Sequence, residues 1–315
     1  MQAVLDQLLV LGGKPIEQLT PQEARRQPTP ADAVRALLIK RGRGSEPEPV
    51  ARIEDKFIPG PGGDIEIRIY TPDGVGPFPV ILYIHGGGWV IADLNVYDSS
   101  PRALANAAKA VVISTHYRLA PEYPFPASHE DTFAAYRWAL DNAKTFNGNA
   151  NRVAVVGESA GGNMAASICL MAREQSVPAP VYQVLIYPVV GTDEKTPSFQ
   201  ENANAKPLSK AMMEWFGKHE FQKRQDRQDP RIDLLNANLR GLPPATIITA
   251  QIDPLRSGGR MLADRLKAAG VKVVYKNYDG VTHEFFGMAA VLDESKEAIK
   301  LAAEDLLKAF KLAAN

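Results

Sequence analysis

The stretch Gly157-Glu158-Ser159-Ala160-Gly161 decides the fold of this chain because of what stands on either side of it. A predicted buried strand, residues 152–156, precedes it, and an alanine-rich segment of helical character begins at Ala160. Small residues flank the serine, as a sharp change of chain direction requires. The sequence therefore predicts a strand, a tight turn and a helix. The turn lifts the Ser159 hydroxyl above the edge of a sheet, next to the free N–H groups of the helix start.

Continuous apolar runs recur along the chain, and helix-like stretches separate most of them. Such runs are typical of parallel strands that are covered on both faces, and their alternation with helices predicts an α/β fold with a doubly wound sheet. In addition, Ile65, Ile67 and Ile69 alternate with charged residues, which predicts a half-exposed antiparallel strand at the sheet edge. The runs are 80–84, 111–113, 153–156, 184–186 and 245–248, and the helix-like stretches are 101–109, 125–144, 160–173, 257–269 and 293–312.

Two segments differ from this pattern. Residues 1–45 contain two or three short amphipathic helices, with helix starts at Thr20-Pro21 and Thr29-Pro30. Residues 189–243 contain no strand-like run but a polar loop and a helix over 209–221. A connection of this length is usually functional. We expect 46–188 and 244–315 to form the core, and the two segments to form a helical cap above the carboxyl edge of the sheet.

Composition excludes several classes of protein. Lys plus Arg and Asp plus Glu both number 36, so the chain lacks the basic excess that nucleic-acid or anionic-membrane partners require. The single cysteine, Cys169, excludes an intrachain disulfide. Residues 1–11 lack the basic region of a signal peptide, and no apolar run reaches the roughly 18–20 residues of a membrane span. These features predict a soluble cytoplasmic protein without integral membrane association.

A second motif follows the apolar run that ends at Ile84. It is His85-Gly86-Gly87-Gly88-Trp89, whose glycines allow the backbone itself to approach a ligand. A loop of this type donates N–H groups to the oxyanion in lipases and esterases. One such donor contributes about 3–4 kcal/mol to transition-state stabilisation. The alternative is a flexible glycine turn, just as Ser159 could stand in a tight turn without chemistry.

A serine nucleophile requires a base, and in hydrolases with this turn the chain order is serine, acid, histidine. Two histidines follow Ser159. His219 falls in the predicted cap helix among charged residues, which favours a solvated surface position. His283 follows a predicted strand, 271–278, and a turn, so it lies at the edge where sheet-end sites are built. We therefore assign His283 as the base.

The carboxylate that orients the base should also follow a strand. Asp253 stands directly after the apolar run 245–250, which makes it the first candidate. Asp279 and Glu284 are close to His283 in sequence and rank below it. His283-Glu284 is not a zinc signature, because no second histidine stands four residues on. We predict no metal site.

In these motifs the chain resembles the hormone-sensitive-lipase family of bacterial carboxylesterases, which have the α/β-hydrolase fold. The resemblance implies Ser159 as nucleophile, His283 as general base and acid, and Asp253 as its partner. It also implies an oxyanion hole made by the N–H groups of Gly87, Gly88 and Ala160. Glu158 departs from the aspartate that many members carry. The matching segments are 85–89, Tyr117-Arg118-Leu119-Ala120-Pro121-Glu122, 157–163, Asp253-Pro254-Leu255-Arg256 and His283-Glu284-Phe285-Phe286.

The resemblance implies hydrolysis of short- to medium-chain carboxylic esters through an acyl-enzyme, with no metal or organic cofactor. The only partner expected is the small-molecule ester, and the chain is expected to be a monomer or a homodimer. Alternatives are an amidase, lactonase or deacetylase on the same scaffold, or a binding protein without turnover. Residues 117–122 are expected to brace the glycine loop. The candidate pocket residues are Tyr187, Leu208, Met212, Met213 and Phe216.

Overall fold

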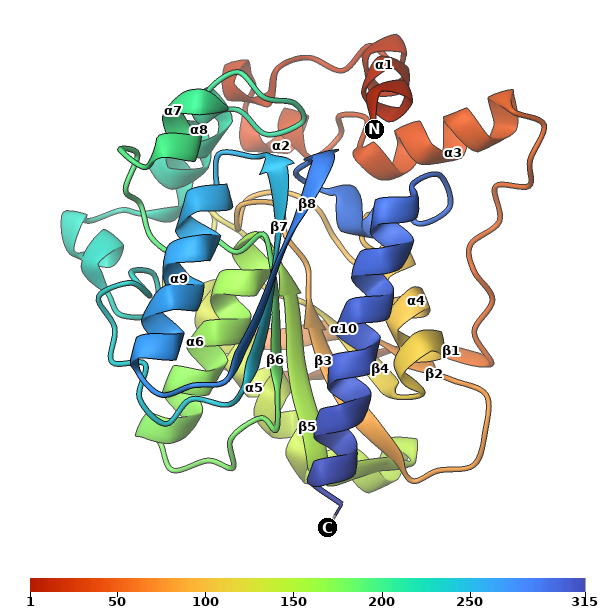
Figure 1. The fold of residues 1–315 in the computed structure, drawn as a ribbon, viewed down its shortest axis with the longest axis vertical. Helices are drawn as coiled ribbons and strands as arrows, with labels where there is room; N and C mark the ends of the chain where they lie inside the picture. The colour runs from red at the N-terminus through yellow and green to blue at the C-terminus, as the bar shows by residue number, and fades with distance from the viewer. Residues whose placement is uncertain (315) are drawn as a thin grey trace.

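A sheet of eight strands forms the centre of the molecule in this computed structural model, which describes residues 1–314 (Figure 1). The strand order is β1-β2-β4-β3-β5-β6-β7-β8. Strands β3 to β8 are parallel to one another, whereas β2 pairs antiparallel with both β1 and β4. The bounds are β1 Arg52–Gly60, β2 Gly63–Thr71, β3 Phe78–Ile84, β4 Val111–His116, β5 Gly148–Glu158, β6 Gln183–Ile186, β7 Ala245–Ile252 and β8 Val273–Thr282.

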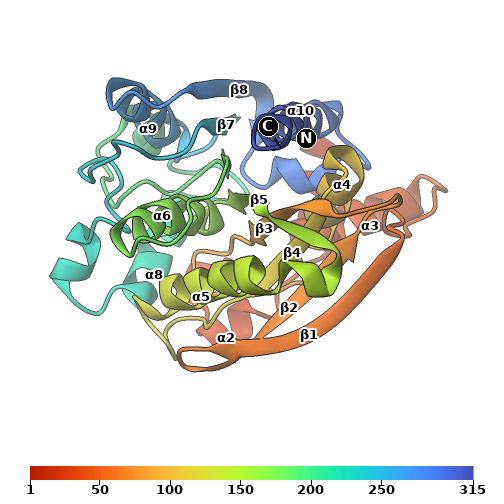
Figure 2. The ribbon, with the colours of Figure 1, turned by 90° about the horizontal axis from the view of Figure 1, so that it is seen from below.

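Helices cover both faces of this sheet (Figure 2). Alternate residues of β3 show why: Val80 and Leu82 pack into the core on one face, and Ile81 and Tyr83 into the core on the other. Two buried faces explain the continuous apolar runs, and the prediction of an α/β fold is confirmed. One face carries α5 (Ala127–Asn142), α6 (Ala160–Glu174) and α9 (Arg256–Ala268), and the other α4 (Ser99–Ala108) and α10 (Asp293–Leu312).

The prediction that the strand around Ile67 lies at the sheet edge was wrong. That strand, β2, has a neighbour on each side, and the edge is formed by β1. Charged residues with no clean alternation fill β1, and within its nine residues Ile58 is the one that is buried. An edge strand exposed on both faces lacks the hydrophobic pattern that identifies strands in sequence, so β1 was missed.

The helices of residues 1–45 and of residues 189–243 lie together beyond the carboxyl ends of the strands (Figure 1). They touch where the indole of Trp215 donates a hydrogen bond to the carbonyl of Leu19, at 3.2 Å. The capping boxes expected at Thr20 and Thr29 are both present. These helices are α1 (Gln2–Val10), α2 (Pro21–Ala24), α3 (Pro30–Lys40), α7 (Pro197–Glu201) and α8 (Lys210–Glu220).

Among residues 1–314, no helix has both the length and the apolar character needed to cross a bilayer.

Candidate active site

Ser159 occupies the sharp turn between β5 and α6. Its backbone has φ 58° and ψ −118°, a conformation that an L-residue rarely adopts and that the surrounding structure must enforce. The turn is held by a hydrogen bond of 2.9 Å from the Ser159 amide to the carbonyl of Ile186. The flanking glycines have no room for a side chain, since a Cβ on Gly157 would lie 2.1 Å from the carbonyl oxygen of Gly161. The local sequence thus builds a turn that presents the serine hydroxyl.

Three side chains from three different loops form a hydrogen-bonded chain at this turn. Ser159 Oγ lies 2.9 Å from Nε2 of His283, and Nδ1 of His283 lies 2.7 Å from Oδ2 of Asp253. Asp253 follows β7 and is fully buried, with its second oxygen accepting a bond from the Leu255 amide at 2.8 Å. By contrast, His219 lies apart from this chain in α8, where it is partly exposed and packs against Trp215.

Burial and charge act in opposite directions on His283. Burial by itself lowers the pKa of the imidazole, but the charge and hydrogen bond of Asp253, with a further contribution from Glu284, raise it above its ordinary value. A histidine base can both accept and return a proton during turnover. The arrangement is that of a nucleophile, a general base and a carboxylate that orients the base.

The glycine loop lies beside the serine and offers N–H donors. Among residues 1–314, the amides of Gly87, Gly88 and Ala160 donate to no backbone carbonyl or side chain within hydrogen-bond distance. Gly88 and Ser159 face the same cavity, and Ala160 begins α6. Free amides at a helix start and in an adjacent loop can stabilise a forming oxyanion.

Two groups of side chains brace this loop. The hydroxyl of Tyr117 donates to the carbonyl of Gly86 at 2.9 Å, and its neighbour Arg118 makes a two-pronged ion pair with Asp131, at 2.8 Å for each prong. Arg25, the residue after α2, donates a hydrogen bond of 2.8 Å to the carbonyl of Val90. Arg25 was not expected here. It lies in the N-terminal segment, whose sequence motifs mark helix starts but give no sign of which loop Arg25 meets.

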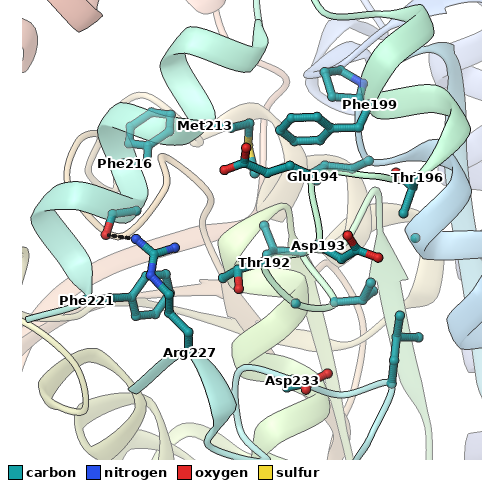
Figure 3. Close-up of a pocket in the computed structure, with 18 of the residues that line it drawn as sticks. Thr192, Asp193, Glu194, Thr196, Phe199, Met213, Phe216, Phe221, Arg227 and Asp233 are labelled. Atoms are coloured by element: carbon teal, nitrogen blue, oxygen red, sulfur yellow. Dashed lines mark hydrogen bonds between the residues drawn. The ribbon is translucent and has the colours of Figure 1, made fainter. Parts of the chain in front are cut away.

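Ser159 lines a cavity of about 630 Å³. Figure 3 shows part of the wall of this cavity. Its wall is apolar on the cap side, where Met213 and Phe216 of α8 face Phe199 of α7. Charged side chains line other parts of it. The guanidinium of Arg227 is fixed 4.8 Å from the ring of Phe221 and does not project freely into the space. The charged lining residues are Asp193, Glu194, Arg224, Arg227, Asp233 and Arg265.

Some of the predicted pocket residues line this cavity, and others do not. Leu208, Met213 and Phe216 line it. Met212 does not, because successive residues of a helix point about 100° apart. Tyr187 does not line it either, since its side chain is buried and its hydroxyl donates to Glu158. Phe199 was missed, because it lies in a polar stretch that has no periodic pattern.

Within residues 1–314, no three or more His, Cys, Asp or Glu side chains cluster in a way that could hold a metal ion.

Comparison with known proteins places the chain in a family. Residues 81–287 match the family described by the alpha/beta hydrolase fold. The chain belongs to this family. It is 40% identical to the carboxylesterase NlhH of Mycobacterium tuberculosis over 86% of this chain and 88% of the relative. It is 33% identical to an ethyl acetate hydrolase of Pseudomonas putida over 93% of this chain and 91% of the relative.

The fold matches solved structures over nearly its full length. A hyperthermophilic esterase from the archaeon Pyrobaculum calidifontis superposes with a TM-score of 0.88 at 37% identity, covering 98% of this chain and 96% of the other. The α/β-hydrolase fold and the resemblance to this group of esterases, both inferred from the motifs, are therefore confirmed.

Proposed function

We propose that this chain is a carboxylesterase that hydrolyses small carboxylic esters through an acyl-enzyme on Ser159. The observation that carries the proposal is the hydrogen-bonded chain from Ser159 through His283 to Asp253, at 2.9 and 2.7 Å, whose serine lines a cavity. The carboxylesterases and esterases among the relatives support the same reaction class.

The reaction follows from this geometry. The ester carbonyl oxygen lies toward the amides of Gly87, Gly88 and Ala160, Ser159 Oγ attacks the carbonyl carbon, and its proton passes to Nε2 of His283. Collapse of the tetrahedral intermediate breaks the bond to the alkoxy oxygen, which leaves as the alcohol with the proton from His283. A water molecule then repeats the sequence on the acyl-enzyme, with His283 as base, and releases the acid.

The cavity supports short to medium acyl chains. Its volume of about 630 Å³ falls within the range of pockets for drug-sized ligands, about 300–1,000 Å³, so a small ester fits inside it. The ring of Phe216 lies directly on the glycine loop, since a Cβ on Gly88 would be 2.3 Å from it. A bulky aromatic ring this close to the glycine loop, in the cavity that Ser159 lines, limits the length of chain that the cavity accepts.

The proposal is tested with matched substrates of one acid. We expect p-nitrophenyl and ethyl esters to be hydrolysed with kcat/KM far above that of the corresponding anilide, lactone and N-acetyl compounds. A fluorophosphonate probe should label one equivalent of Ser159. A higher kcat/KM for the amide or the lactone would favour the amidase or lactonase alternative. Failure to label together with no turnover would favour a binding protein.

Replacing Phe216 by alanine should extend the range of acyl chains. We expect kcat/KM for esters two to four methylenes beyond the wild-type optimum to rise roughly 15- to 200-fold, because each accommodated methylene contributes about 0.8 kcal/mol. The measurement is a kcat/KM series over p-nitrophenyl esters of increasing length. Met212→Ala is the matched control, since Met212 lies on the same helix but does not line the cavity. An unchanged optimum in Phe216→Ala would show that another residue sets the limit.

A further inference from the structure

Glu284 stands directly after His283 in an unusual backbone conformation. Its φ of 70° and ψ of 4° are left-handed, which few non-glycine residues adopt. The turn brings the carboxylate back beside the imidazole, so that Oε1 lies 3.7 Å from Nε2 of His283. Nε2 is also the atom that lies 2.9 Å from Ser159 Oγ. A second carboxylate therefore flanks the nitrogen that receives the proton.

A buried tyrosine holds this carboxylate in place. The hydroxyl of Tyr97 donates a hydrogen bond of 2.7 Å to Oε1 of Glu284. The same hydroxyl packs on the glycine loop, since a Cβ on Gly86 would lie 2.4 Å from it. Tyr97 thus contacts the loop that carries the oxyanion donors and, through Glu284, the residue next to the base. Glu284 is not free to swing into solvent, although about a fifth of its side chain is exposed.

The other titratable groups around His283 come from different elements. Asp253, after β7, meets Nδ1, and the ring of Tyr187, after β6, lies 4.4 Å from the imidazole. Glu158, at the end of β5, accepts hydrogen bonds from Tyr187 and from Tyr83 of β3. Burial raises the pKa of Glu158 to about 7 and also raises the pKa of Glu284, against the opposing effect of His283.

We propose that Glu284, held by Tyr97, is a positioning residue for the general base: it stabilises the imidazolium of His283 that forms when Ser159 attacks. The proposal rests on the function proposed above. In that step the bond from Ser159 Oγ to the carbonyl carbon forms, the carbonyl electron pair moves to oxygen, and the proton moves to Nε2. His283 is then positive between Asp253 at Nδ1 and Glu284 near Nε2. When the proton passes to the departing alkoxide, His283 is neutral again.

The test is the pH dependence of kcat/KM in Glu284→Gln. Glutamine keeps an acceptor for Tyr97 but removes the negative charge, so His283 should lose its proton at lower pH. We expect the midpoint of the acidic limb to move down by about half to one pH unit, the displacement that a neighbouring charge at this distance produces. We expect kcat at the optimum to fall about five- to tenfold, with KM changed by less than about twofold.

Three further variants make this result decisive. Glu304→Gln removes an exposed carboxylate on α10 and should leave the profile unchanged. Tyr97→Phe removes the hydrogen bond that favours the charged form of Glu284, so it should move the acidic limb in the same direction. The double variant Tyr97→Phe/Glu284→Gln should then match Glu284→Gln, because both changes act through one charge.

An acidic limb that stays in place in both Glu284→Gln and Tyr97→Phe would overturn the proposal, even if kcat falls. A structural defect lowers kcat without moving the pKa of His283, which the acidic limb reports. If Glu284→Gln does not fold, the position of the acidic limb in Tyr97→Phe alone tests the proposal. Ser159→Ala, assayed alongside, distinguishes failure of the proposed function from failure of the proposed role of Glu284. Activity in Ser159→Ala contradicts the proposed function, whereas its loss together with an unmoved limb contradicts only the role of Glu284.

Discussion

Ser159→Ala should fold as the parent protein does and lose on the order of 10⁶-fold in kcat, the loss known for removal of a serine nucleophile that acts as a unit with its base. Alanine keeps a Cβ at the strained φ of 58°, and among the residues that the structure describes the side chain loses only the 2.9 Å bond to His283. The measurement is steady-state hydrolysis of a short-chain p-nitrophenyl ester, together with fluorophosphonate labelling and a thermal melt.

The matched control for this variant is Ser167→Ala. Ser167 is a buried serine on α6, the helix that follows Ser159. Its Oγ has no hydrogen-bond partner among the residues that the structure describes. It should keep kcat and lose no labelling. Turnover by Ser159→Ala within about tenfold of the parent, with labelling retained, would refute the assignment of the nucleophile.

Asp253→Asn should lower kcat about 10⁴-fold, the effect seen when an amide replaces the carboxylate of such a triad. The buried carboxylate accepts the proton on Nδ1 of His283 at 2.7 Å and so leaves Nε2 free to act as base toward Ser159. An amide nitrogen in that place donates instead, which favours the tautomer with the proton on Nε2. Because the size and the bond from the Leu255 amide are conserved, we expect KM and the thermal midpoint to change little.

Asp279→Asn is the control, because Asp279 is one of the two other carboxylates that the sequence offers as partner of His283. It lies exposed on β8, bonded to Asn277 at 2.9 Å. Its kcat should match that of the parent protein. Equal losses in the two variants, or a full rate in Asp253→Asn, would show that Asp253 is not the partner of the base.

Much of the fold was accessible from sequence, for a physical reason. Parallel strands buried on both faces require continuous apolar runs, and 80–84 and 153–156 coincide with β3 and β5. Where burial is weak this reasoning fails, as at β1, which has one buried residue and was missed. The same limit explains Arg25, whose sequence neighbours give no sign that it meets the glycine loop.

Side-chain direction was the other limit. Tyr187 follows β6 next to the site and was expected to face substrate, yet its hydroxyl meets the buried Glu158 beneath it. Only the packing of three strands decides which way such a side chain turns. Glu284 was considered as the acid and ranked low because of its closeness to His283 in sequence. A left-handed turn places it at Nε2 rather than Nδ1, which no spacing rule predicts.

The sequence by itself determined the elements and their order: the turn at Gly157 to Gly161, the glycine loop, and an acid and a histidine after later strands. Local chemistry suffices for these, since strand burial and tight turns act over a few residues. The tertiary structure alone decided how the parts meet, namely the 2.9 and 2.7 Å contacts of His283, the aromatic wall at Phe216, and Tyr97 beside Glu284. These contacts join residues far apart in the chain, and packing of the whole fold sets their distances.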